Sequence, residues 1–86
     1  MSEKEKKHQQ AQKFRKELQT VLGRVRAIEA LASKEHFDEQ DILNLKILSQ
    51  KKFSDCKDVY PLLIINLREK GMNKEADIFQ DIWISC

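Results

Sequence analysis

The sequence predicts a small all-α bundle of about four helices, in which one long N-terminal helix packs with three shorter ones. Apolar residues near the N-terminus follow an unbroken helical spacing. The 86 residues contain only two glycines and one proline, too few for the tight hairpins of a sheet-rich fold. Charged residues make up 35% of the chain and apolar residues 41%, which is typical of helices that have a buried face and a long solvated face.

The first predicted helix spans residues 11–32. Its apolar residues are separated by alternating steps of three and four: Ala11, Phe14, Leu18, Val21, Val25, Ile28 and Ala32. Leu22 and Leu31 widen this apolar seam, which favours packing against more than one helix. No apolar residue lies between Ser2 and Ala11, so we expect residues 1–10 to form a frayed or disordered basic segment. Residues 11–86 then form a single helical-bundle domain.

The second predicted helix spans residues 39–52. Asp38 is a favourable N-cap, and Asp41 places a negative charge in the first turn. Phe37 and Ile42 occupy the two positions of a hydrophobic staple. We expect one broad face of this helix to be buried, formed by Ile42, Leu43, Leu45, Ile47 and Leu48.

The third predicted helix spans residues 59–70 and is the most apolar. Asp58 is its expected N-cap, which places Pro61 in the first turn, where a missing N–H does least harm. Its apolar residues are Leu62, Leu63, Ile64, Ile65 and Leu67, so this helix is expected to be central.

A tight turn around Gly71 is predicted to join the third helix to the fourth. Gly71 supplies the left-handed residue of a Schellman motif, and Met72 folds back on Leu67. Asn73 is the expected cap of the fourth helix. The residues expected to point inward from that helix are Ala76, Phe79, Ile82 or Trp83, and Cys86.

The composition indicates a cytoplasmic protein without a membrane partner. The first ten residues are charged and lack the apolar run of a signal peptide, so we expect Cys56 and Cys86 to be reduced. No stretch approaches the roughly 20 apolar residues that span a bilayer.

No pattern in the sequence indicates an enzyme, a metal site or a cofactor. The histidines His8 and His36 and the two cysteines lack the spacing of zinc ligands, and a Cys56–His36 nucleophilic pair has no third group to orient it. Helix capping explains the acidic residues near the helix starts, which are Asp38, Glu39, Asp41, Asp55 and Asp58. The two glycines are too far apart for a phosphate-binding loop. We therefore predict no catalytic, cofactor-binding or metal-binding residues.

Nucleic-acid binding is the alternative function. Residues 1–29 contain eight Lys and Arg and four Glu, a net charge of +4, so residues 30–86 carry −2. The residues that would contact phosphates are Lys4, Lys6, Lys7, Lys13, Arg15 and Lys16. A helix–turn–helix motif is not favoured, because its recognition helix would be the fourth helix. That helix carries three acidic residues and only one basic residue, Lys74, so its charge would repel the phosphate backbone of DNA.

Protein binding is the function that the sequence favours. A helix of residues 2–32 is about 45 Å long at ~1.5 Å per residue, and no single short helix covers its seam. We therefore expect a small regulatory or adaptor protein that uses this helix to bind another protein or to form a dimer. The predicted contact residues are Ala11, Phe14, Leu18 and Val21, with Phe79 and Trp83 as a second, aromatic patch.

Overall fold

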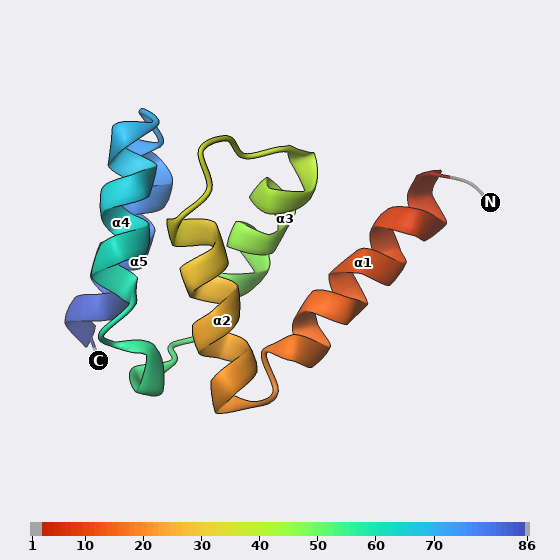
Figure 1. Cartoon of the computed structure of the whole chain (residues 1–86), viewed down its shortest axis with the longest axis horizontal. Coiled ribbons are helices and arrows are strands. Elements are labelled where there is room, and N and C mark those ends of the chain that lie inside the picture. Colours follow the sequence, from red (N-terminus) through yellow and green to blue (C-terminus); the bar gives the residue numbers. More distant parts are fainter. Residues whose placement is uncertain (1–2, 86) are drawn as a thin grey trace.

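Residues 3–85 fold as an all-α bundle of five α-helices and one short 3₁₀-helix. The structure is a computed structural model that describes residues 3–85, with side chains described from Gln9 onward. The helices are α1 (Glu3–Glu17), α2 (Val21–Ala32), α3 (Glu39–Leu48), η1 (Ser54–Cys56), α4 (Tyr60–Glu69) and α5 (Asn73–Ser85). α4 and α5 form a hairpin, α2 packs on α4, and α1 leans against α3 at the other end of the molecule (Figure 1).

The predicted long N-terminal helix is wrong, because the chain breaks between α1 and α2. α1 ends at Glu17, and Thr20 is the N-cap of α2, with extended backbone and a side-chain oxygen that accepts from the N–H of Gly23 at 3.1 Å. Neither Gly nor Pro lies between Glu17 and Thr20. The break is held by this local cap together with contacts of the Arg24 side chain, and helical spacing alone could not reveal it.

Arg24 is the residue that ties this break to the rest of the fold. Its Nε donates to the carbonyl oxygen of Leu18 at 2.6 Å, and its Nη1 donates to Oδ2 of Asp55 at 2.8 Å. The guanidinium also lies 4.9 Å from the centre of the Phe53 ring, a cation–π contact. One side chain thus connects the α1–α2 turn to η1.

The start of α3 confirms the predicted cap. Asp38 accepts from the N–H of Asp41 at 2.8 Å, and the Asp41 carboxylate accepts from the N–H of Asp38 at 3.0 Å, forming a capping box. Lys34 donates to Asp41 at 2.7 Å, and this hydrogen bond raises the pKa of Lys34. The helix ends at Leu48 and not at residue 52, since the chain turns there to insert Phe53 into the core.

The predicted cap of α4 is wrong. Asp58 lies in a turn that continues from η1, and Val59 occupies the N-cap position without a side-chain hydrogen bond. An N-cap carboxylate normally sits on extended backbone, which this turn does not provide. Pro61 is nevertheless in the first turn, as predicted.

The α4–α5 turn is the predicted Schellman motif. Gly71 has φ of 76°, a left-handed conformation that a residue with a Cβ rarely adopts. The N–H of Met72 donates to the carbonyl of Leu67 at 2.9 Å, and the N–H of Gly71 donates to that of Arg68 at 3.0 Å. α5 begins at Asn73.

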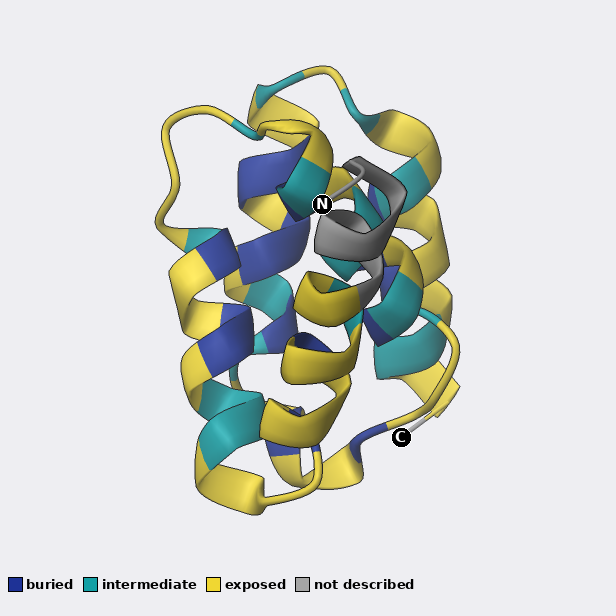
Figure 2. Ribbon diagram, turned by 90° about the vertical axis from the view of Figure 1, so that its right-hand side faces the viewer, coloured by how far each residue is buried: buried dark blue, intermediate teal, exposed yellow. Residues whose placement is uncertain are grey.

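The core lies where α2, α4 and α5 meet and extends to α1 and α3. Buried residues gather on the inward sides of the helices, while α1 is exposed over most of its described surface (Figure 2). The most deeply buried large side chains are Tyr60, Phe79, Ile28, Leu45, Leu48, Leu63, Leu67 and Cys56. Among the described side chains, α1 adds Phe14 to this core, and the turn that follows α1 adds Leu18.

The N-terminal segment that we expected to fray is helical from Glu3 onward. Met1, Ser2 and Cys86, including the predicted inward position of Cys86, lie outside the described residues.

Candidate functional site

The predicted contact residues do not share one surface. Phe14, Leu18 and Phe79 are buried in the core, and the Phe79 ring packs beside Tyr60 with 6.3 Å between ring centres. Ala11 and Trp83 are partly exposed. Val21, at the start of α2, is 54% exposed. A partner that meets the folded chain therefore reaches Val21 but not Phe14, Leu18 or Phe79.

The apolar residues that the fold leaves exposed point to another surface. Among the described residues, the large apolar side chains that are exposed are Val21, Leu22, Ile42, Leu62, Ile65, Ile78 and Ile84. Leu62 and Ile65 are 54% and 55% exposed, and they lie three residues apart on the outer face of α4. The sequence predicted that the helix carrying them is central, without saying which of its apolar residues stay outside.

Leu62 and Ile65 line a groove between α2 and α4, which we call the α2–α4 groove. Its volume is about 570 Å³. The residues that line it are Glu29, Ala32 and Ser33 from α2 and the end of that helix, and Leu62, Ile65, Asn66 and Glu69 from α4. Ala32 is small and partly buried, so its side chain fills little of the groove beside Leu62 and Ile65.

Polar groups hold the walls of the α2–α4 groove in place. The Asn66 amide nitrogen donates to the carbonyls of Leu31 and Lys34 at 2.9 and 3.0 Å, which ties α4 to the end of α2. Lys70 donates to the Asn66 side-chain oxygen at 2.7 Å. Of the residues that line the groove, Glu29 and Glu69 are the charged ones, and both are exposed.

The sequence of α4 explains why this face is apolar. Four consecutive apolar residues, 62–65, cover nearly a full turn, so they cannot all face one core. Leu63 and Ile64 turn inward with Leu67, and Leu62 and Ile65 are left outside. A run that is apolar all round, on the surface of a bundle this small, is the signal that could have located this groove.

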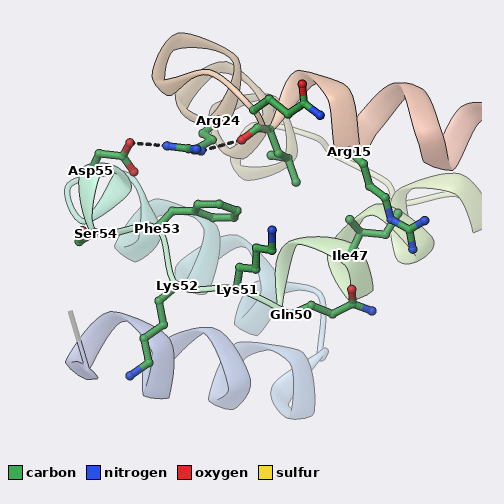
Figure 3. Close-up of a pocket in the computed structure, with 11 residues that line it drawn as sticks. Arg15, Arg24, Ile47, Gln50, Lys51, Lys52, Phe53, Ser54 and Asp55 are labelled. Atoms are coloured by element: carbon green, nitrogen blue, oxygen red, sulfur yellow. Dashed lines mark hydrogen bonds and ion pairs between the residues drawn. The ribbon is translucent and has the colours of Figure 1, made fainter.

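A second groove is lined by basic residues (Figure 3). Its volume is about 700 Å³, and its charged residues are Arg15, Arg24, Lys51, Lys52 and Asp55. Arg24 is already bound to Asp55 and to the Leu18 carbonyl. Lys51 points toward α1 and α2, whereas Lys52 points away from them. Arg15 and Lys51 are therefore the cations in this groove that are available to an anion.

The structure only partly places the basic residues predicted to contact nucleic acid. Lys13, Arg15 and Lys16 are exposed on the second half of α1. The side chains of Lys4, Lys6 and Lys7 lie outside the described part of the chain. Lys51 was not among the predicted residues, because its position beside Arg15 depends on how α3 packs against α1.

The histidine, cysteine and acidic side chains form no metal-binding cluster in the described part of the chain. Across the residues that the structure describes, no three His, Cys, Asp or Glu side chains lie close enough to share a metal ion. The Cys56 side chain is buried, with 1% of its surface exposed. The Asp38 carboxylate serves as the α3 cap.

Comparison of the chain with known protein-family models, curated proteins and solved structures finds no match. Within the described residues, no helix combines the length and the apolar character needed to cross a membrane.

Proposed function

We propose that this chain is a small protein-binding protein, and that its α2–α4 groove receives an amphipathic helix from a partner protein. The observation that carries the proposal is the pair Leu62 and Ile65, two large apolar side chains that are half-exposed side by side beside Ala32. Helix-in-groove binding uses such a surface, because an apolar face of the partner fills the space between two helices.

The charge around the groove supports a basic partner helix. Glu29 and Glu69 line the groove, and no cation lines it with them. A helix with an apolar stripe flanked by Lys or Arg would bring positive charge to both carboxylates. Charge pairs at the rim chiefly set orientation and partner choice, while the apolar contact supplies affinity.

We further propose that the chain acts as a regulatory or adaptor protein in the cytoplasm, as the sequence predicted. The folded bundle offers a partner the α2–α4 groove in place of the N-terminal apolar seam, because Phe14 and Leu18 are buried.

The direct test uses a designed peptide as the partner. The peptide is a helix of about 18 residues with leucine on one face and lysine elsewhere, long enough to be helical when bound. Its affinity is measured by fluorescence anisotropy with the wild-type chain and with the double variant Leu62→Gln, Ile65→Gln. Loss of two apolar contacts predicts at least about tenfold weaker binding to the variant.

Two controls make this test specific. Ile78→Gln alters an apolar residue that is 47% exposed but lies on α5 and does not line the groove, so its affinity should equal that of the wild type. A matched peptide with glutamate in place of lysine should bind more weakly than the lysine peptide. Equal binding of both peptides, or equal loss in the Ile78→Gln variant, would contradict the proposal.

Binding of nucleic acid through α1 is the second candidate, and the observation that favours it is Arg15 facing the same groove as Lys51. On this candidate, a labelled DNA duplex binds the wild-type chain, and binding weakens severalfold or more between 50 and 200 mM salt. Charge reversal at Arg15 and Lys51 would remove that binding but leave the lysine peptide unaffected. Absence of salt-dependent binding to the duplex would remove this candidate.

A further inference from the structure

We propose that the α1–α2 junction is a hinge at which α1 exchanges between two copies of this chain. In the exchanged dimer, α1 and α2 of each copy form one continuous helix, and each α1 packs on α3 of the other copy. This inference is independent of the α2–α4 groove.

The apolar spacing is the first observation behind the hinge. The three-and-four alternation runs through the break without interruption, with Leu18, Val21 and Val25 at successive positions. In the folded monomer the break turns Val21 outward, where it is 54% exposed. In a continuous helix the same residue would lie on the face shared by Leu18 and Val25.

The second observation is that the residues of the break are compatible with a helix. The four residues at the junction, 17–20, are Glu, Leu, Gln and Thr, of which the first three are good helix formers. What holds the break is the Thr20 cap, the Arg24 contacts with Leu18 and Asp55, and the fit of Gly23. The junction itself carries no residue that excludes a helix, so a continuous helix requires only that the cap and these side-chain contacts be released.

The way α1 packs on α3 explains why a second copy of this chain would receive it. α1 is held by the buried side chain of Phe14, by Leu18 in the turn that follows it, and mainly by contacts with α3. A continuous helix of residues 3–32 would be about 45 Å long, whereas the whole folded chain extends 40 Å along its longest axis. Straightening therefore carries Phe14 away from its own α3, and α3 of a second copy offers it an identical site.

Two substitutions at the hinge have opposite expected effects. Gly23→Ala places a Cβ against the backbone oxygen of Glu17 and 2.8 Å from Oγ1 of Thr20, so it disfavours the break. The same alanine favours a continuous helix. Val21→Pro does the reverse, because proline is tolerated at the first helical position after an extended residue, and Thr20 is extended. Within a continuous helix that proline would remove a hydrogen bond and clash with the preceding turn.

The experiment measures molar mass by light scattering after each protein is refolded from denaturant at low and at high concentration. We expect the wild type to form a dimer fraction that grows with concentration, and Gly23→Ala to raise that fraction at least about tenfold at equal concentration. Val21→Pro should remain monomeric throughout. Gly71→Ala is the control, since its left-handed backbone makes it destabilising but it lies far from the hinge, and its dimer fraction should match that of the wild type.

Circular dichroism of the same samples identifies any variant that has not folded. If Gly23→Ala is unfolded, the comparison of the wild type with Val21→Pro still tests the proposal, since only the wild type should form a dimer. Monomers in both, or dimers in both, would overturn the proposal. The double variant Leu62→Gln, Ile65→Gln should form the same dimer fraction as the wild type. If this variant stayed monomeric, the α2–α4 groove would be the self-association surface, and the hinge proposal would be overturned.

Discussion

The amide of Asn66 joins α4 to the end of α2 and to the loop that follows it. It donates to the carbonyl of Leu31 in the last turn of α2 and to that of Lys34 just beyond the helix, and its own oxygen accepts from Lys70. Carbonyls in the last turn of a helix have no partner within that helix. A side chain from α4 therefore completes α2, and it does so directly beneath the α2–α4 groove.

We expect Asn66→Ala to lower the free energy of unfolding by about 1–3 kcal/mol, because buried carbonyls lose their donors. Urea unfolding followed by circular dichroism measures the change. Asn44→Ala is the matched control, since Asn44 accepts only from Gln40 on the same helix and is partly exposed. An equal effect at both positions would show that the Asn66 network adds nothing specific.

The Asp38 cap makes stability depend on pH in acid. The N–H of Asp41 donates to the Asp38 carboxylate, which lowers the pKa of Asp38 below its ordinary value of 3.8. A group whose pKa is lower in the folded state contributes stability above its unfolded pKa and loses it as the pH falls through the folded value. This contribution is therefore present at neutral pH and lost below about pH 3.8.

Asp38→Asn keeps an acceptor for the cap but cannot titrate. We expect its urea midpoint to fall less steeply than that of the wild type between about pH 5 and pH 2. Asp38→Ala removes the acceptor as well and should be less stable than Asp38→Asn at every pH. Parallel pH profiles for wild type and Asp38→Asn would contradict the assignment.

At the scale of elements, α1 is the helix least integrated into the bundle. Of its described side chains Phe14 is the buried one, Leu18 is buried in the turn that follows, and most of the remaining described surface of α1 is exposed. We expect Phe14→Ala to cost about 3–5 kcal/mol if α1 unfolds with the rest, and less if α1 alone detaches. Hydrogen exchange separates the two cases, because detachment removes protection in α1 while α4 and α5 stay protected.

Local signals in the sequence predicted several helix ends. Asp38, with Asp41 three residues later, predicted the start of α3, and Gly71 followed by Met72 predicted the end of α4. These ends depend on hydrogen bonds among residues next to one another in the chain. The α1–α2 break depends on the Thr20 cap and also on Arg24 reaching Asp55, 31 residues away. Helical spacing carries no information on such a distant contact.

The exposed face of α4 was missed for a related reason. An apolar run predicts burial, but it does not say how many of its sides a bundle of 86 residues can cover. Leu63 and Ile64 are buried, whereas their neighbours Leu62 and Ile65 are not. Only the packing of α2 and α5 around α4 decides which side chains remain outside.

At the scale of the whole molecule, the fold has two separate surfaces of different character. The α2–α4 groove is apolar with acidic residues at its rim, and the groove beside α1 is mainly basic. One chain can therefore present an apolar, acidic face to a partner while the N-terminal helix remains on the other side of the bundle (Figure 1).

The most direct test of the proposed function is a methyl nuclear magnetic resonance titration of the wild-type chain with the lysine and leucine peptide. We expect the largest shifts on the methyl groups of Leu62, Ile65 and Ala32, and no shift of those of Ile78 and Ile42. Shifts centred on Val21 and Leu22, or no shifts at peptide concentrations that saturate the anisotropy signal, would contradict the proposed function.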